Sequence, residues 1–209
     1  MALQHPSDNP VKHRFSDLPK EKRLEIKSWK VNVKETFNLA YIYKILHDWG
    51  VAEGWAPADD SKFQEVYYLQ RDNPNFGKEL RIRWRWKKDA PSLGKLFTYT
   101  MDVDFYTLGI KDTEMSWQGQ KIKAQKGEFE IECVAALLID EEGSWDKSIL
   151  KPLKEIYIKR IIKNKFTSHK IEVENSSMRF RDFIVEHFRL HKFFPEKEAS
   201  EFFSKKDLG

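Results

Sequence analysis

Few residues in this sequence have types and spacing that could support catalysis or metal binding. His187 and His191 are four residues apart, so a helix would place both imidazoles on one face, as in many zinc sites. No glutamate follows His187 and no third ligand is evident, so we predict no metal. His47 and Asp48 are adjacent, and adjacent side chains on a helix diverge. We expect no catalytic residue and no cofactor.

Cys133 is the only cysteine, which excludes an intramolecular disulfide and a cysteine metal cluster. It lies in an apolar segment without an obvious base, so we expect a buried, inert thiol. The sequence also lacks a glycine-rich phosphate loop, a Gly-x-Ser-x-Gly elbow and a zinc-protease motif. Nothing in it therefore argues for an enzyme, although enzymatic activity is not excluded.

Arg160 lies in the middle of an otherwise apolar helical face with Leu153, Ile156 and Tyr157. A guanidinium in that position could clamp a carboxylate or phosphate of a ligand. The alternative is an internal ion pair, or an aliphatic stem that carries the charge out to water. The sequence favours the second interpretation but leaves both open.

The segment from Lys78 to Lys88 alternates more regularly than any other part of the chain, as a half-buried strand does. Apolar residues, among them Trp84 and Trp86, alternate with a ladder of basic residues. The neighbouring strand-like segments carry acidic side chains on their polar faces, and opposite charges on adjacent strands stabilise pairing. We therefore expect an ionic lattice on the polar face, rather than a stripe that binds nucleic-acid phosphates.

The order of periodic segments predicts an α+β fold. Short connections between successive strands imply an antiparallel, curved sheet of about six to seven strands, packed on a long C-terminal helix. We predict a helix at 152–166, a linker at 167–174, and an added C-terminal helix at 176–192 that Ser176 or Ser177 could cap.

Composition predicts three regions: a flexible N-terminal arm at 1–24, a single α+β domain at 25–192, and a charged C-terminal tail at 193–209. The N-terminus lacks the apolar core of a secretion signal, and no apolar run approaches the ~20 residues of a membrane helix. We therefore expect a cytoplasmic protein that does not span a membrane. The net charge of +4 says little about partners.

The order strand, helix, antiparallel strands, long helix resembles the helix-grip arrangement of the START and Bet v 1-like (SRPBCC) superfamily. The resemblance covers residues 26–166, rests on element order alone, and leaves the helix at 176–192 as an addition. It implies a curved sheet wrapped around a long helix, often with a hydrophobic cavity between them. That superfamily includes lipid carriers, cyclases, hydrolases and ligand sensors, so the resemblance does not define a function.

We therefore expect a non-enzymatic binding protein that holds a hydrophobic or amphipathic, lipid-like small molecule between the sheet and the long helix. A filled core in place of a cavity stays open at this point. The alternative is an interaction or assembly protein whose basic C-terminal helical layer, residues 147–192, binds nucleic acid or another acidic partner. The sequence indicates no oligomeric state. The predicted ligand-binding residues are Tyr67, Trp84, Trp86, Phe105, Tyr157, Arg160 and Ile161.

Overall fold

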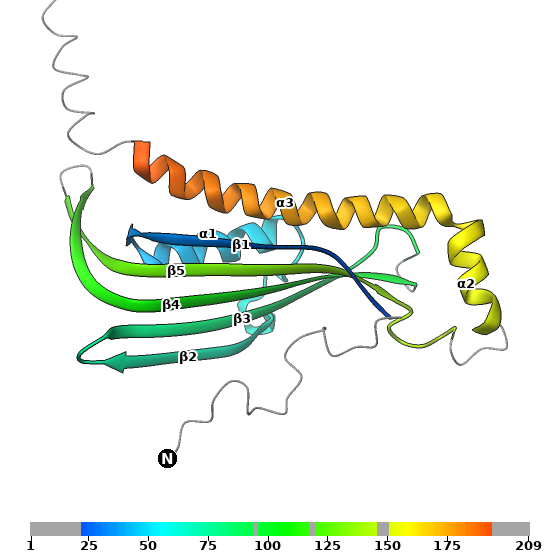
Figure 1. Ribbon diagram of the computed structural model, residues 1–209, viewed down its shortest axis with the longest axis horizontal. Helices are drawn as coiled ribbons and strands as arrows, with labels where there is room; N and C mark the ends of the chain where they lie inside the picture. The colour runs from blue at the N-terminus through cyan, green and yellow to red at the C-terminus, as the bar shows by residue number, and fades with distance from the viewer. Residues whose placement is uncertain (1–21, 94–95, 118–119, 146–150, 194–209) are drawn as a thin grey trace, which may run out of the picture.

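The structure, a computed structural model, describes residues 22–93, 96–117, 120–145 and 151–193. It has an α+β fold in which one antiparallel sheet is covered on one face by two helices (Figure 1). The strand order is β1-β5-β4-β3-β2, so β1 and β2 are the two edges. The main elements are β1 (Arg23–Phe37), α1 (Leu39–Ala52), β2 (Glu65–Asn73), β3 (Gly77–Asp89), β4 (Phe97–Trp117), β5 (Gln120–Ile139), α2 (Lys154–Ile156) and α3 (Lys163–Phe193).

The sheet has five strands, fewer than the six to seven predicted, because two segments whose sequence resembles a separate hairpin are extensions of longer strands. The segments 112–117 and 121–124 form the ends of β4 and β5. A register shift between Leu108 and Lys111, beside Gly109 at φ +64°, bends the pair without ending it. Figure 1 shows the two strands curling together beyond this bend.

The C-terminal helical region also differs from the prediction. The predicted linker at 167–174 is helical and belongs to α3, which runs unbroken over 31 residues. Thr167, Ile171 and Val173 have modest helix propensity, but Val173 is fully buried, so tertiary packing decides the conformation. The predicted helix at 152–166 is instead divided between α2, a π-helical turn at Tyr157–Ile161 and the first residues of α3.

Two serines predicted as caps lie in the middle of α3 and join the helix to the rest of the protein. Ser177 Oγ accepts a hydrogen bond of 2.8 Å from Trp29 Nε1 of β1, and Ser176 Oγ accepts one of 3.1 Å from Trp55 Nε1. Both hydroxyls are buried, where a polar group needs a hydrogen-bond partner, and the indole N–H groups provide it. The helix is therefore fixed along β1 by specific contacts as well as by apolar packing.

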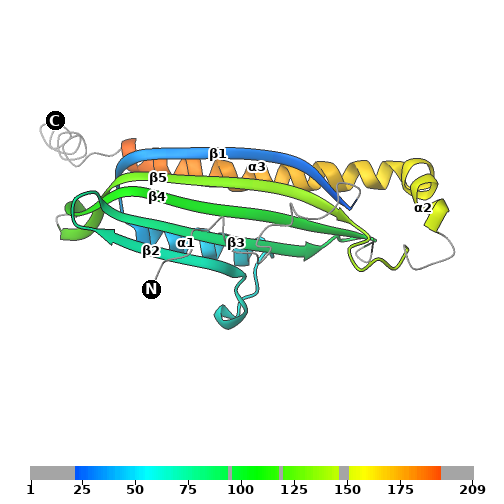
Figure 2. The ribbon, with the colours of Figure 1, turned by 60° about the horizontal axis from the view of Figure 1, so that its bottom comes forward.

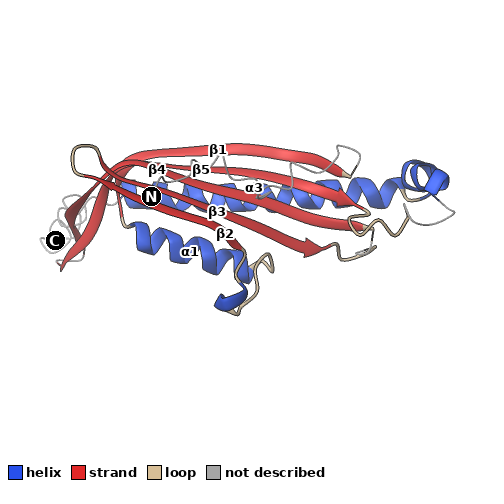
Figure 3. Ribbon diagram, turned by 90° about the horizontal axis from the view of Figure 1, so that it is seen from below, coloured by secondary structure: helices blue, strands red, loops and turns tan. Residues whose placement is uncertain are grey.

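The core is the sheet face beneath α1 and α3, which lie side by side over it (Figures 2 and 3). Trp86 packs against Trp49 of α1 and Phe180 of α3, with ring centroids 6.0 and 5.3 Å away. Gly50 allows this close approach, because a Cβ there would lie 2.6 Å from the Trp86 ring. We call this face the inner face and the opposite one the outer face.

The predicted arm and tail fall mostly outside the described ranges. Residues 1–21 and 194–209 belong to those undescribed parts, so both regions stay predictions. β1 begins at Arg23, within the range assigned to the arm.

Candidate functional site

The structure brings three of the seven predicted ligand-binding residues together. Trp84, Trp86 and Phe105 lie on the inner face and are buried. The ring centroid of Trp84 is 5.4 Å from that of Trp86 and 4.5 Å from that of Phe105. The alternation of β3 therefore predicted this cluster correctly.

Tyr67 instead lies on the outer face, opposite Arg83 in the register of β2 and β3. The Arg83 guanidinium carbon is 5.2 Å from the centre of the Tyr67 ring. A register shift between Glu65 and Tyr67 interrupts simple alternation, so the two residues face opposite sides of the sheet. Glu65 takes the inner position, where its Oε2 accepts hydrogen bonds from Tyr43 Oη (2.9 Å) and Trp84 Nε1 (3.0 Å).

Tyr157, Arg160 and Ile161 lie in the π-helical turn, away from the aromatic cluster. The Tyr157 ring stacks on Trp145 at a centroid distance of 5.0 Å, whereas Arg160 and Ile161 are exposed. They do not meet the aromatic cluster because α3, and not the predicted helix at 152–166, covers the sheet. Of the two interpretations of Arg160, the one that carries its charge out to water fits this exposure.

The interior around the tryptophans is occupied by protein side chains. Tyr43, at 5.2 Å, and Phe63, at 5.1 Å, meet the Trp84 ring edge-on, and α1 and α3 cover Trp86 as described above. Such contacts between large rings exclude water and stabilise a core through buried area. Of the two alternatives that the sequence leaves open, these contacts favour a filled core at Trp84 and Trp86.

A groove of about 630 Å³ lies at the edge of the sheet, between β1 and the C-terminal half of α3. Its volume is within the range of about 300–1,000 Å³ that is typical of small-molecule sites. None of the seven predicted ligand-binding residues lines it. The lining residues are Val31, Asn32, Val33, Lys34, Glu35, Val185 and Phe188.

The groove combines an apolar wall with a polar rim. Val31 and Val33 pair with Ile131 and Phe129, so both project toward the inner face, where Val185 and Phe188 of α3 complete the wall. Lys34 is exposed at the rim, with its Nζ 3.3 Å from Glu128. Among the described strands β1 is an edge, so its outer backbone side pairs with no other described strand.

Hydrogen-bonding side chains surround His169. Nothing in the sequence singles out this histidine, because it lies in the predicted linker. His169 Nδ1 is 2.7 Å from Tyr99 Oη, and Nε2 is 3.2 Å from Ser92 Oγ. Burial lowers the pKa of His169, with a further contribution from Lys165, and burial raises the pKa of Tyr99 to about 12. The imidazole is therefore neutral at neutral pH and connects α3 to β4 and to the loop after β3.

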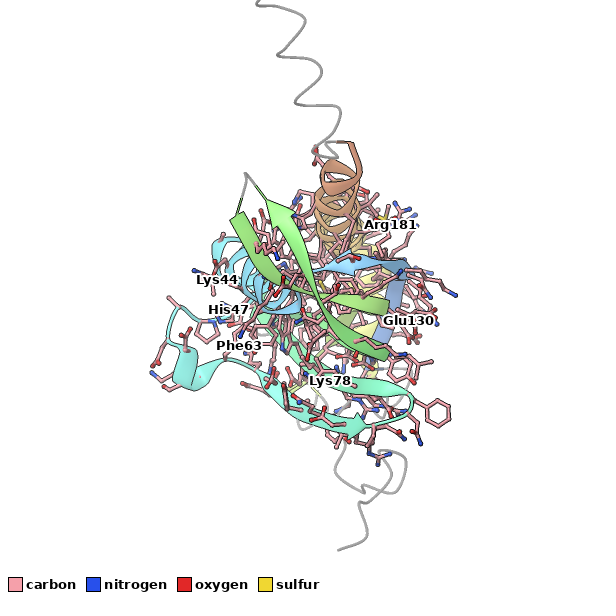
Figure 4. All side chains as sticks on the ribbon, turned by 90° about the vertical axis from the view of Figure 1, so that its left-hand side faces the viewer. Lys44, His47, Phe63, Lys78, Glu130 and Arg181 are labelled. Carbon is pink, nitrogen blue, oxygen red and sulfur yellow. The ribbon has the colours of Figure 1, made fainter. Side chains whose placement is uncertain are left out.

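Of the three histidines considered from the sequence, the structure describes the side-chain environments of His47 and His187. His47 and Asp48 do not diverge as expected: His47 Nδ1 is 3.4 Å from Asp48 Oδ1, and its Nε2 is 3.4 Å from Asp60 Oδ1. The imidazole also packs on Phe63 at 4.2 Å, and both residues lie at the α1 side of the molecule (Figure 4). His187 contacts the Tyr41 ring at 5.4 Å, and the side chain of His191 lies outside the described part.

The outer face carries the predicted ionic lattice. Arg85 Nη1 is 2.7 Å from Asp104 Oδ1, and Arg85 Nε is 3.7 Å from Asp102 Oδ1. Nearer the β1 edge, Lys30 Nζ is 2.8 Å from Glu130 Oε1. Two other residues of the basic ladder are paired likewise: Arg83 Nε is 4.0 Å from Asp104 Oδ2, and Lys87 Nζ is 2.7 Å from Glu141 Oε2. These protein carboxylates argue against a phosphate-binding stripe on this face.

Cys133 is fully buried on the inner face, and burial raises the pKa of its thiol. Its Sγ is 4.0 Å from Ser177 Oγ. The expectation of a buried thiol is therefore confirmed, and its inertness stays a prediction.

No family model matches this chain, and no curated protein is similar to it in sequence. Among the helices of the described ranges, none is both long enough and apolar enough to cross a bilayer.

Proposed function

We propose that this protein is a non-enzymatic binding protein that holds a hydrophobic or amphipathic small molecule in the groove between β1 and α3. The observation that carries the proposal is the apolar wall of that groove, formed by Val31, Val33, Val185 and Phe188. An elongated ligand would place its apolar part against this wall and its polar end at the open rim near Lys34. This is the ligand class expected from the sequence, with the site moved from the sheet interior to the sheet edge.

The packing of the core supports this relocation. Trp84 and Trp86 are surrounded by other rings, so a ligand there would have to displace several large side chains. At the edge, the apolar wall already faces open space, and a ligand would bury it without rearranging the core. The helix-grip resemblance stays a proposal of its own, based on element order.

A titration with a dansyl-labelled fatty acid tests the groove. Val185→Asp places a carboxylate on the apolar wall, and we expect it to weaken probe binding about tenfold or more, because a charge there would lose solvation beside the ligand. Val66→Asp is the matched control, since Val66 is an exposed valine on β2, the opposite edge of the sheet.

Unchanged probe affinity in Val185→Asp, or equal losses in both variants, would contradict the proposal. Native mass spectrometry of the gently purified protein gives an independent measurement. A co-purifying lipid-sized mass that disappears in Val185→Asp and persists in Val66→Asp is the expected result.

A further inference from the structure

Residues 152–165 form a projection, here called the tip, that extends past the end of the sheet (Figures 1 and 2). It comprises the end of a 3₁₀ turn at Lys151–Leu153, α2, the π-helical turn and the first residues of α3. The tip is remote from the groove, so the inference below goes beyond the proposed ligand-binding function.

Three large aliphatic side chains of the tip are exposed to solvent. Leu153, Ile156 and Ile161 are 50%, 51% and 70% exposed, although Ile158 and Ile162 in the same segment are buried. The π-helical turn, marked by the bond from Ile162 N to Tyr157 O of 3.0 Å, aligns residues five apart. Ile156 and Ile161 are therefore on the same side of the turn. Exposed aliphatic side chains grouped in this way indicate a surface that another body covers.

Basic side chains accompany this apolar surface. The tip has five basic residues and a single acidic one, Glu155, which is paired with Lys159. Arg160, Lys163 and Lys165 are exposed, and none of them is in an ion pair with a described residue. Within the described part of the chain no carboxylate neutralises these three charges, and the external partner that they complement is anionic.

The base of the tip is firmly attached to the end of β5. The Lys154 ammonium donates a hydrogen bond of 2.8 Å to Asp140 Oδ2, and the Trp145 backbone N–H donates one of 3.1 Å to Asp140 Oδ1. Burial of Asp140 opposes ionisation, but these donors and Ser144 outweigh it and lower the pKa of Asp140 to about 2. The attachment holds the exposed aliphatic and basic residues outward.

We propose that the tip docks on the surface of a membrane that contains anionic lipids. Leu153, Ile156 and Ile161 would enter the headgroup region, while the exposed basic side chains contact lipid phosphates and carboxylates. Nucleic acid would satisfy the charges but offers no apolar environment to three aliphatic side chains. A cytoplasmic location, which the sequence predicts, would bring the tip to the leaflet where acidic lipids are concentrated.

Co-sedimentation of the full chain with vesicles tests this proposal. We expect binding to phosphatidylcholine vesicles that contain phosphatidylserine, and little binding to phosphatidylcholine alone. Lys163→Glu together with Lys165→Glu should weaken binding more than tenfold, because each basic residue near an acidic surface contributes about fivefold. Ile156→Ser together with Ile161→Ser should weaken it about tenfold or more by removing inserted apolar area.

Phe76→Ser is the matched control. Phe76 is 74% exposed, in the turn between β2 and β3, at the opposite end of the molecule from α2 (Figure 1). This variant should bind vesicles as the unchanged chain does, and circular dichroism checks that all variants are folded.

Three results would overturn the proposal. The first is no binding of the unchanged chain to acidic vesicles. The second is full binding by the folded Ile156→Ser, Ile161→Ser variant, which would place the contact elsewhere. The third is salt-dependent binding to duplex DNA or RNA without vesicle binding, which would assign the basic tip to nucleic acid.

Discussion

The two faces of the sheet are stabilised in different ways, even at consecutive residues of β3. Trp84 and Trp86 on the inner face are buried among rings, which stabilise the fold through apolar area removed from water. Arg85, between them, is also buried, but on the outer face and against Asp102 and Asp104. The attraction between two buried, paired charges offsets little more than the free energy that their desolvation costs. The inner face therefore supplies most of the stability, and the outer face mainly specifies pairing.

The largest effect that this comparison predicts is the removal of an inner-face ring. Trp86→Ala would leave a cavity among Trp49, Trp84 and Phe180, and we expect it to lower the free energy of unfolding by about 3–5 kcal/mol. Urea denaturation followed by circular dichroism measures the change. A loss below about 1 kcal/mol would show that the rings are not the main source of stability.

An intermediate effect is expected at His169, a polar residue of α3 that packs against Phe97 and Tyr99 of the inner face. Its pKa is lower in the folded chain than the unperturbed value of 6.5, because burial penalises the imidazolium. The unfolded chain therefore takes up a proton at a higher pH than the folded chain does. Stability should fall as the pH drops below about 6.5, until the folded pKa is reached.

Thermal melts at neutral and mildly acidic pH measure this dependence. His169→Gln keeps hydrogen-bonding groups near Tyr99 and Ser92 but cannot titrate, so it should lose this part of the pH dependence. An identical pH profile in the variant would assign the dependence to other groups.

The smallest effect is expected on the exposed part of the outer face. Lys30→Ala removes the pair with Glu130, and we expect the unfolding midpoint to stay unchanged within error, because solvent screens exposed ion pairs. The same urea denaturation measures it. A loss comparable to that of Trp86→Ala would reverse the comparison between the two faces.

The sequence predicted those features that depend on local alternation. Alternation along a strand decides which side chains share a face, and it can be read from neighbouring residues alone. It predicted the inner positions of Trp84, Trp86 and Phe105 and the ionic lattice on the other face. The number of strands was overestimated because Gly109 and the turn-like residues around it bend β4 and β5 without ending them. In this segment, the same residues are compatible with a bend within a strand and with the end of a strand, so the sequence does not distinguish the two.

The missed parts depend on tertiary contacts. Residues 167–174 read as a linker, yet the burial of Val173 and His169 makes them helical. Tyr67 lies on the outer face and not on the predicted inner face, because of a register shift that the neighbouring sequence does not reveal. The groove likewise joins β1 to Val185 and Phe188, about 150 residues further along the chain, and only the packing of α3 along β1 brings them together.

The π-helical turn at Tyr157–Ile161 determines which side chains of the tip lie on the same side of the helix axis. Such a turn contains one residue more than an α-helical turn, and each residue of a helix corresponds to a rotation of about 100°. An α-helical turn with the same residues would therefore place Ile161 about 140° around the axis from Ile156, whereas the π-helical turn puts both on one side. Deleting one residue between Tyr157 and Ile161 would leave these two isoleucines four apart, the spacing that an α-helix aligns, so the apolar surface of the tip would survive the loss of the π-helical turn.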